Sequence, residues 1–198
     1  MVASDLSMAK QVSSVCQACI ITVRCLRRLA PLISRATLHS AVLATVISRM
    51  DYGNALYAGI ASQLLHRLQT IQNDAVRLIC QVLRYLRATP LLQELHWLPM
   101  AQRVIFKVMC LVHKLKHNTV SGPLAKRSVP YLLTRSLRSA DADRMTTPWF
   151  HKSTMGARAF SVWAPKYWNT LLPALRNEVN FPKFRKLLKT HLFSLSLA

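Results

Sequence analysis

Apolar residues recur at three- and four-residue steps along most of this 198-residue chain. Such spacing places side chains on one face of an α-helix, whereas a strand exposed on one side alternates every second residue. The clearest stripe lies near the N-terminus and consists of Val12, Val15, Cys16, Cys19, Val23, Leu26 and Leu29. We therefore expect an all-α fold. The chain has only four glycines, which disfavours a β-rich architecture with many tight turns.

Prolines and capping residues divide the pattern into separate helices. Pro31 ends the first helix, and a second helix begins near Ser34 and runs towards Asp51. Ser62 is the expected N-cap of a third helix. Its apolar stripe continues to Val82, so we expect the helix to include that residue.

Two proline-containing pairs mark the next boundaries. Thr89-Pro90 is typical of the N-cap and first residue of a short helix, and Leu98-Pro99 ends that helix. A fourth long helix then extends to Lys116. We predict that residues 6–116 form an antiparallel helical bundle.

The composition changes after residue 116. Residues 117–154 are polar and basic and contain several prolines, which predicts a long loop or linker. Residues 155–195 combine an aromatic block (Phe160, Trp163, Tyr167 and Trp168) with a final helix that opens at Pro182. We expect these residues to form a small C-terminal module. The apolar face of its helix is predicted to carry Phe184, Leu187, Leu188, His191 and Leu192.

Positive charge is the strongest functional signal in the composition. The chain has 27 Lys and Arg against 7 Asp and Glu, a formal net charge of +20. Residues 100–198 carry 17 of the basic residues but only 3 of the acidic ones. Such an excess favours polyanionic partners, of which RNA and DNA are the leading candidates.

Seven basic residues are our candidates for contacts with the phosphates of RNA or DNA. They are Arg127, Arg135, Arg138, Lys183, Arg185, Lys186 and Lys189. Tyr131, Trp149 and Phe150 lie between the basic residues of the loop and could stack on unpaired bases. Two alternatives stay open: a merely solvated basic surface, and a final helix that lies on an anionic membrane surface.

Metal and nucleophile patterns are weak. Cys16, Cys19 and Cys25 lack a fourth zinc ligand at suitable spacing, and the first two lie on the apolar stripe. His113 and His117 form an i,i+4 pair without the glutamate of a metalloprotease motif, so a solvated pair is expected. The chain has neither a Gly-x-Ser-x-Gly elbow nor a glycine-rich phosphate loop. We therefore expect no catalytic residues, no metal and no cofactor.

No apolar run approaches the roughly 18 residues of a membrane span. Asp5 and Lys10 interrupt the N-terminus where a signal peptide would become apolar. We therefore expect an intracellular protein of the nucleus, the cytoplasm or both.

Several motifs, in order along nearly the whole chain, resemble the reverse transcriptases of non-LTR (LINE) retrotransposons of the chicken-repeat/Jockey group. They are DLSM at 5–8 with QV at 11–12, SRMDYGNALYAG at 48–59, LQxIQNDAVRLI at 68–79, LHWLP at 95–99, RxxFK at 103–107, RSLRSAD at 135–141, RAFSxxAPxxWN at 158–169 and KTHLF at 189–193. The matching region lies downstream of the catalytic palm. The resemblance thus implies thumb-like helices and a C-terminal region that grip the template–primer duplex or element RNA.

The resemblance also implies what this chain lacks. The aromatic-x-Asp-Asp motif that holds two metal ions in the family has no counterpart here, so we expect no polymerase activity. The family commonly has a cysteine where Gly53 stands. Residues 82–87 replace a turn that contains Gly and Thr, which predicts a longer third helix. The stretch 118–133 is shorter than in the family.

Two other interpretations of the same chain remain. One is a structural or protein-interaction module that self-associates through apolar surface. The other is the product of a decayed retroelement copy that has no function of its own.

Overall fold

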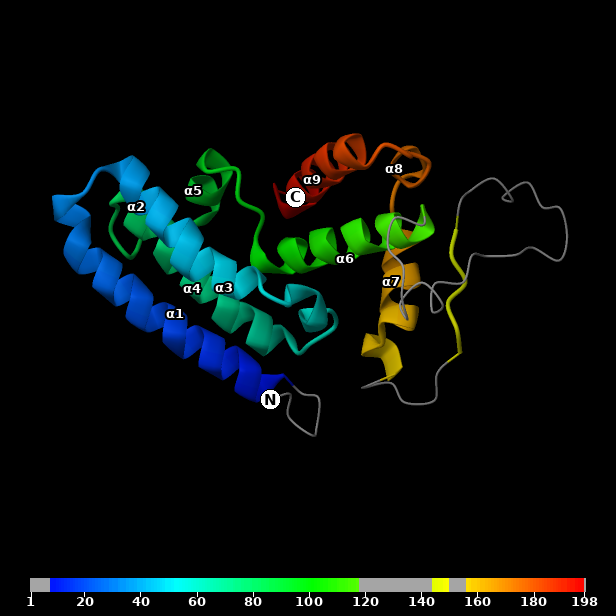
Figure 1. Ribbon diagram of the computed structural model, residues 1–198, viewed down its shortest axis with the longest axis horizontal. Coiled ribbons are helices and arrows are strands. Elements are labelled where there is room, and N and C mark those ends of the chain that lie inside the picture. Colours follow the sequence, from blue (N-terminus) through cyan, green and yellow to red (C-terminus); the bar gives the residue numbers. More distant parts are fainter. Residues whose placement is uncertain (1–7, 118–143, 150–155, 198) are drawn as a thin grey trace, which may run out of the picture. The chain divides into compact units, whose positions relative to one another are not determined.

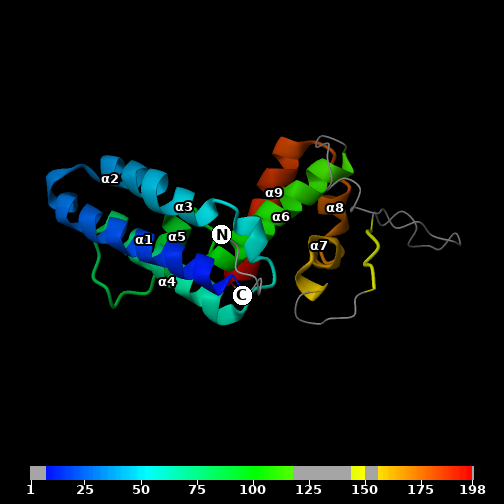
Figure 2. The ribbon, with the colours of Figure 1, turned by 60° about the horizontal axis from the view of Figure 1, so that its bottom comes forward.

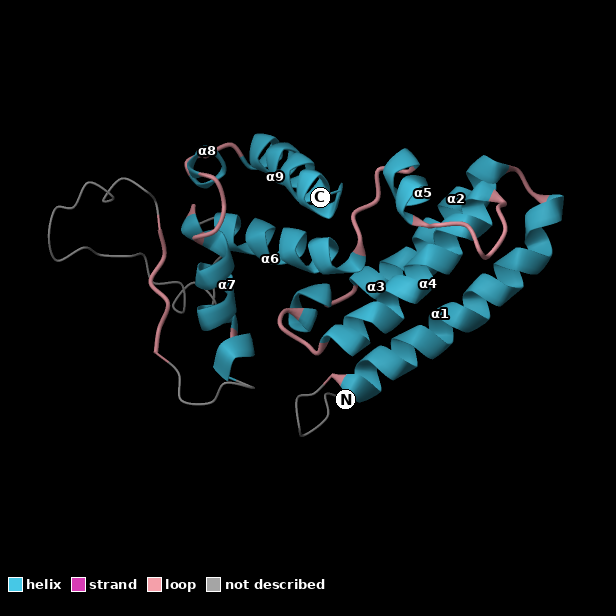
Figure 3. Ribbon diagram, turned by 180° about the vertical axis from the view of Figure 1, so that it is seen from behind, coloured by secondary structure: helices cyan, strands magenta, loops and turns pink. Residues whose placement is uncertain are grey.

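The computed structural model describes residues 8–117, 144–149 and 156–197. Within these ranges the regular elements are helices, and no strand is present (Figures 1 and 3), which confirms the predicted all-α class. The chain divides into two compact units, Met1–Arg103 and Val104–Ala198, which we describe separately. The boundary falls inside a helix, and the predicted extents 6–116, 117–154 and 155–195 stay predictions.

The first unit contains α1 (Ala9–Leu29), α2 (Arg35–Val42), α3 (Ser48–Asp51), α4 (Ser62–Cys80), α5 (Thr89–Glu94) and the start of α6 (Met100–Lys116). Short 3₁₀ turns cover Ala30–Leu32 and Asn54–Tyr57. Helices α1, α2 and α4 lie side by side in both views (Figures 1 and 2). The predicted stop at Pro31 and the start at Ser34 are confirmed, and the Ser34 side chain accepts a hydrogen bond from the Thr37 N–H.

The core of the first unit is formed where the apolar stripes of these helices meet. Its buried residues include Val12, Cys16, Cys19 and Val23 of α1, Leu38 and Val42 of α2, and Leu68, Ile71, Ala75 and Ile79 of α4. The stripe of α1 ends earlier than predicted, because Leu29 is exposed at the last turn. Burying these apolar side chains provides the main driving force for packing the helices.

A π-helical turn, Leu43–Ile47, joins α2 to α3. The wider turn adds a residue, so that both Val46 and Ile47 are buried before the α-helical repeat resumes. The Thr45 hydroxyl donates to the carbonyl oxygen of Ala41 at 2.7 Å. The sequence predicted one regular α-helix from Ser34 towards Asp51, so the π-helical turn within it was not predicted.

The third predicted helix is confirmed, but both of its ends were placed wrongly. Ala61, not Ser62, is the N-cap of α4, and no side chain caps this end. The helix ends at Cys80 because Gln81 adopts a left-handed conformation with φ 52°. Arg77 then holds the following turn: its Nε donates to the carbonyl oxygen of Leu86 at 2.9 Å. The predicted extension through Val82 is therefore wrong.

Two glutamines of α4 fix the turn that precedes α6. Gln72 is fully buried and donates from Nε2 to the carbonyl oxygen of Leu98 at 2.9 Å. Gln69 accepts a hydrogen bond from the Met100 N–H at 2.8 Å and so caps the start of α6. Its amide nitrogen bonds Asn73 Oδ1. These polar residues satisfy backbone groups at a helix start, where partners are otherwise missing.

An ion pair ties the end of α3 to α6. Arg103 donates from Nε to Oδ1 of Asp51 at 2.9 Å and from Nη2 to Oδ2. The buried Asn54 also donates to Asp51 Oδ1, at 3.1 Å. Gly53 between them is left-handed, with φ +63°. Residues with a Cβ rarely adopt that conformation, so glycine suits this position.

The second unit contains the rest of α6, a 3₁₀ turn (Gly156–Arg158), α7 (Phe160–Trp168), α8 (Pro173–Arg176) and α9 (Phe181–Leu197). Its buried side chains include Val108, Met109 and Val112 of α6, Trp168 of α7, and Phe184, Leu188 and Leu192 of α9. Asn169 bonds both the N–H and the carbonyl oxygen of Met145 at 2.9 Å, which fixes the described segment 144–149. The aromatic block thus contributes to a core.

Candidate nucleic-acid interface

Helix α9 has one apolar and one basic face. Phe184, Leu188 and Leu192 follow at four-residue steps and are all fully buried. The side chains of Lys183, just before Phe184, and of Arg185, Lys186 and Lys189, between the buried residues, are exposed. The periodicity thus places four of the seven predicted contact residues on the solvent side of one helix. Leu187 was expected on the apolar face, but it is 40% exposed.

The four cations have different surroundings. Lys183 forms an ion pair with Glu178, whose pKa is lowered mainly by this hydrogen bond. The Arg185 guanidinium lies 5.7 Å from the ring centre of Phe181, and Lys189 Nζ lies 5.7 Å from that of Phe193. Lys186 has no side-chain partner among the described residues. Three of the four charges are therefore not neutralised by any acidic residue in that part of the chain.

A groove beside these cations lies between α6 and α9. It has a volume of about 290 Å³ and is lined by Phe106, Lys107, Cys110, Leu111, Lys114, Phe181 and Arg185. Lys114 Nζ lies 4.8 Å from the ring centre of Phe181. Lys107 and Lys114 were not among the predicted contact residues. Their spacing of seven places both on one face of α6, and this was the sequence signal that could have identified them.

Cys110 lies in this groove but does not form a nucleophilic site. Burial raises the pKa of its thiol to about 11, although Arg185, Lys107 and Lys114 lower it in part. The thiol is therefore protonated at neutral pH, and the thiolate is the reactive form. The groove offers positive charge and aromatic surface rather than covalent chemistry.

One basic residue of the second unit is not at the surface. Arg176 is 4% exposed, and its Nε and Nη1 have no hydrogen-bond partner among the described residues. Burial, followed by the nearby Arg144 charge, lowers its pKa. Arg176 was not predicted as a candidate, and no sequence signal separates it from the exposed arginines.

Most of the other predicted contact residues lie outside the part of the chain that the structure describes. They are Arg127, Arg135 and Arg138, together with the predicted stacking residues Tyr131 and Phe150. Trp149 is described, and its side chain is 78% exposed. The interface that can be built from the structure therefore consists of α9 and the neighbouring face of α6.

The histidine pair at the end of α6, His113 and His117, is not solvated as expected. His113 is 1% exposed, donates from Nε2 to the carbonyl oxygen of Glu178 at 2.7 Å, and stacks on Phe184 with ring centres 4.3 Å apart. The His117 ring lies 4.4 Å from it. Burial is the main cause that lowers the pKa of both histidines. The pair links α6 to the segment before α9, a role that only the packing of the two helices reveals.

The cysteines of α1 behave as small apolar residues. Cys16 and Cys19 are buried free thiols, and burial raises their pKa, whereas Cys25 is exposed. No group of three or more His, Cys, Asp or Glu side chains within the described ranges is placed to hold a metal ion.

Comparison with known proteins adds no family assignment. No family model, no curated protein and no solved structure matches this chain. None of the described helices is both long and apolar enough to span a membrane.

Proposed function

We propose that the protein binds the phosphate backbone of RNA or DNA through the basic face of α9, without catalysing a reaction. The observation that carries this proposal is the exposed set Arg185, Lys186 and Lys189 on one helix face, next to Lys107 and Lys114 of α6. Lys and Arg side chains release condensed counterions when they neutralise phosphates. The formal charge of +20 supports a polyanionic partner.

The motif resemblance supports a more specific form of the proposal. A fragment downstream of the palm of a LINE-type reverse transcriptase would grip template–primer or element RNA in its parent protein. The parent family is an RNA-directed DNA polymerase, and this chain lacks the aspartate pair of the polymerase site. We therefore assign it a binding role rather than a polymerase activity.

Salt-dependent binding tests the proposal directly. Fluorescence anisotropy with a labelled single-stranded RNA and a matched DNA duplex would be titrated from about 50 to 200 mM salt. The variant Arg185→Gln, Lys186→Gln, Lys189→Gln should bind more weakly at every salt concentration. On the duplex, its salt slope should be shallower by about 0.9 for each phosphate that the variant no longer neutralises.

A matched variant controls for net charge. Lys10→Gln, Arg24→Gln, Arg28→Gln removes three exposed cations of α1 and should retain most of the affinity. Equal losses in the two triple variants would show that only the net charge matters. That result, or no binding at the lowest salt, would contradict the α9 interface.

A second candidate function is self-association. The turn after α4 exposes three large apolar side chains: Leu83 is 60% exposed, Tyr85 80% and Leu86 43%. Exposed apolar side chains that gather in one patch are characteristic of protein contact sites. A second copy of this chain is the partner that this candidate proposes.

A further inference from the structure

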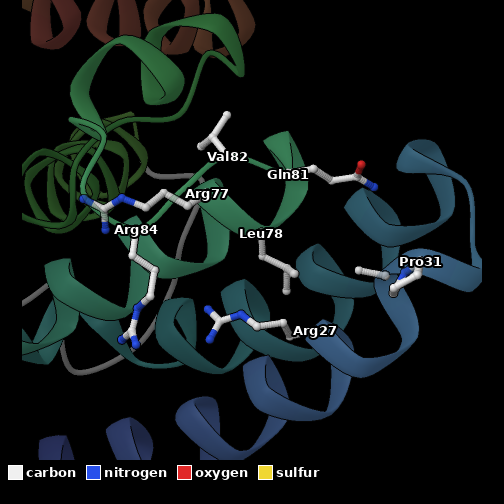
Figure 4. A pocket seen from close by; sticks show the side chains of 8 residues that line it. Arg27, Pro31, Arg77, Leu78, Gln81, Val82 and Arg84 are labelled. Carbon is white, nitrogen blue, oxygen red and sulfur yellow. The ribbon is translucent and has the colours of Figure 1, made fainter.

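A cavity of about 360 Å³ lies where the C-terminal end of α1 meets that of α4, within the first unit. Its apolar lining consists of Ala30, Pro31, Leu78 and Val82. Three arginines, Arg27, Arg77 and Arg84, complete it together with Gln81 (Figure 4). The volume falls in the range of small-molecule sites, and apolar walls with a few charged groups are typical of them.

The three arginines are not equally available to a ligand. Arg77 donates to the Leu86 carbonyl oxygen and pairs with Asp74 at 3.4 Å, so its guanidinium is engaged. Arg27 and Arg84 are exposed and have no hydrogen-bond or ion-pair partner among the described residues. In Figure 4 their guanidinium ends point toward the same space from α1 and from the turn after α4.

These two unpaired charges determine which anion fits. No acidic residue lines the cavity, so no carboxylate there neutralises the two guanidinium groups. A phosphodiester carries a single negative charge, whereas a phosphate monoester carries nearly two at neutral pH and has three acceptor oxygens. The planar fork of arginine binds such oxygens in pairs. A monoester therefore offsets both charges at once.

The apolar lining favours a phosphate that is attached to an organic group over inorganic phosphate. Ala30, Pro31, Leu78 and Val82 offer a surface that inorganic phosphate would leave uncovered. We propose that this cavity binds a phosphate monoester together with the nucleoside that carries it. The source is either the phosphorylated end of a nucleic-acid strand, which rests on the proposed function, or a free nucleoside monophosphate.

Oligonucleotides of one sequence with a 5′-phosphate or a 5′-hydroxyl test this proposal on the full chain. Fluorescence anisotropy at fixed salt should show about tenfold tighter binding of the phosphorylated strand, as expected for one extra pair of charge-assisted hydrogen bonds. The variant Arg27→Gln, Arg84→Gln should lose this preference. The variant Arg24→Gln, Arg28→Gln removes the same charge from exposed positions of α1 outside the cavity and should keep it. Circular dichroism should show that both variants fold.

Competition identifies the source of the phosphate. If adenosine monophosphate displaces the labelled phosphorylated strand with the affinity that it shows in direct binding, the free nucleotide is the ligand. If only an unlabelled phosphorylated strand displaces the labelled one, the strand end is the ligand. Equal affinity for the two strands, with no binding of adenosine monophosphate to the wild-type chain, would overturn the proposal. The proposal would also be overturned if inorganic phosphate displaced the labelled strand as effectively as the nucleotide does.

The proposed function and this inference fail in different ways. The triple variant of α9 should weaken binding of both strands equally and leave the preference for the phosphate unchanged. If that variant binds normally, the α9 interface is wrong while the cavity remains. If the strands do not bind at all, titration with adenosine monophosphate still decides whether the cavity is a ligand site.

Discussion

Several polar side chains of the first unit have structural partners rather than exposed positions. Asp51 pairs with Arg103, Gln72 bonds the Leu98 carbonyl, and Gln69 caps α6. All of them lie in the motifs at 48–59, 68–79 and 103–107. Buried polar groups need such partners, so these motif residues account for how a helical unit is held together. They do not by themselves indicate nucleic-acid binding.

Gly53 provides a test at the scale of one residue. A Cβ at this position would lie 3.8 Å from Leu56 Cδ1, which is an ordinary contact, so space is not the constraint. The left-handed backbone is the constraint, and we expect Gly53→Ala to lower the free energy of unfolding by about 1 kcal/mol. Urea denaturation of the two chains measures the difference.

Asparagine is the matched control for this substitution, because it adopts the left-handed region more readily than alanine. Gly53→Asn should lose less stability than Gly53→Ala. Equal stability of wild type and Gly53→Ala would show that the turn relaxes to another conformation.

At the scale of elements, the joint between α6 and α9 depends on neutral histidines. Burial lowers the pKa of His113 and His117 below the unfolded value of about 6.5. Lys116 adds to this by repulsion, while the Glu178 carbonyl opposes it for His113. Below about pH 6.5 the unfolded chain therefore binds more protons than the folded one.

The pH dependence of stability follows from that difference. The stabilisation by these histidines is complete above about pH 6.5 and is lost as the pH falls. Urea denaturation followed by tryptophan fluorescence should give a lower midpoint at about pH 5.5 than at about pH 7.5. His113→Gln retains a donor for the Glu178 carbonyl but does not titrate, so its midpoint should change less with pH.

His66 offers the control for the histidine test. It is exposed on α4, and His66→Gln should keep the pH dependence of the wild type. If His113→Gln and wild type respond identically to pH, the joint between α6 and α9 is not the sensitive element.

Periodicity predicted the long helices well and their ends less well. The apolar stripes of α1, α4, α6 and α9 were visible because a buried helix face repeats every three to four residues. The stop of α4 at Cys80 was missed because Gln81 is not a residue type that signals a left-handed cap. The π-turn over Leu43–Ile47 was missed because it leaves an apolar pattern that a regular helix also allows.

At the scale of the whole molecule, exposed apolar residues set the expectation for self-association. Static light scattering should give a mass that rises with protein concentration if the turn after α4 contacts a second copy. Leu83→Ser with Tyr85→Ser should reduce this rise, whereas Leu195→Ser, a change at an exposed residue of α9, should not. A constant monomer mass for the wild-type chain would contradict the second candidate function.

The interface and the cavity were predictable to different degrees. The basic face of α9 follows from the spacing of four cations relative to Phe184, Leu188 and Leu192, and the sequence indicated it directly. The cavity combines Arg27 of α1 with Arg84, which is 57 positions later in the sequence. No local pattern relates two residues that far apart, so this site was not predicted.

The sequence by itself determined the helical class, the apolar stripes and the excess of positive charge. These properties depend on residue type and on spacings of a few positions, which local chemistry fixes. The tertiary structure decided that His113 is buried, that Leu29 and Leu187 are exposed, and which arginines meet at a cavity. These depend on contacts between distant segments, because burial is set by the neighbouring helix and not by the residue's own sequence position.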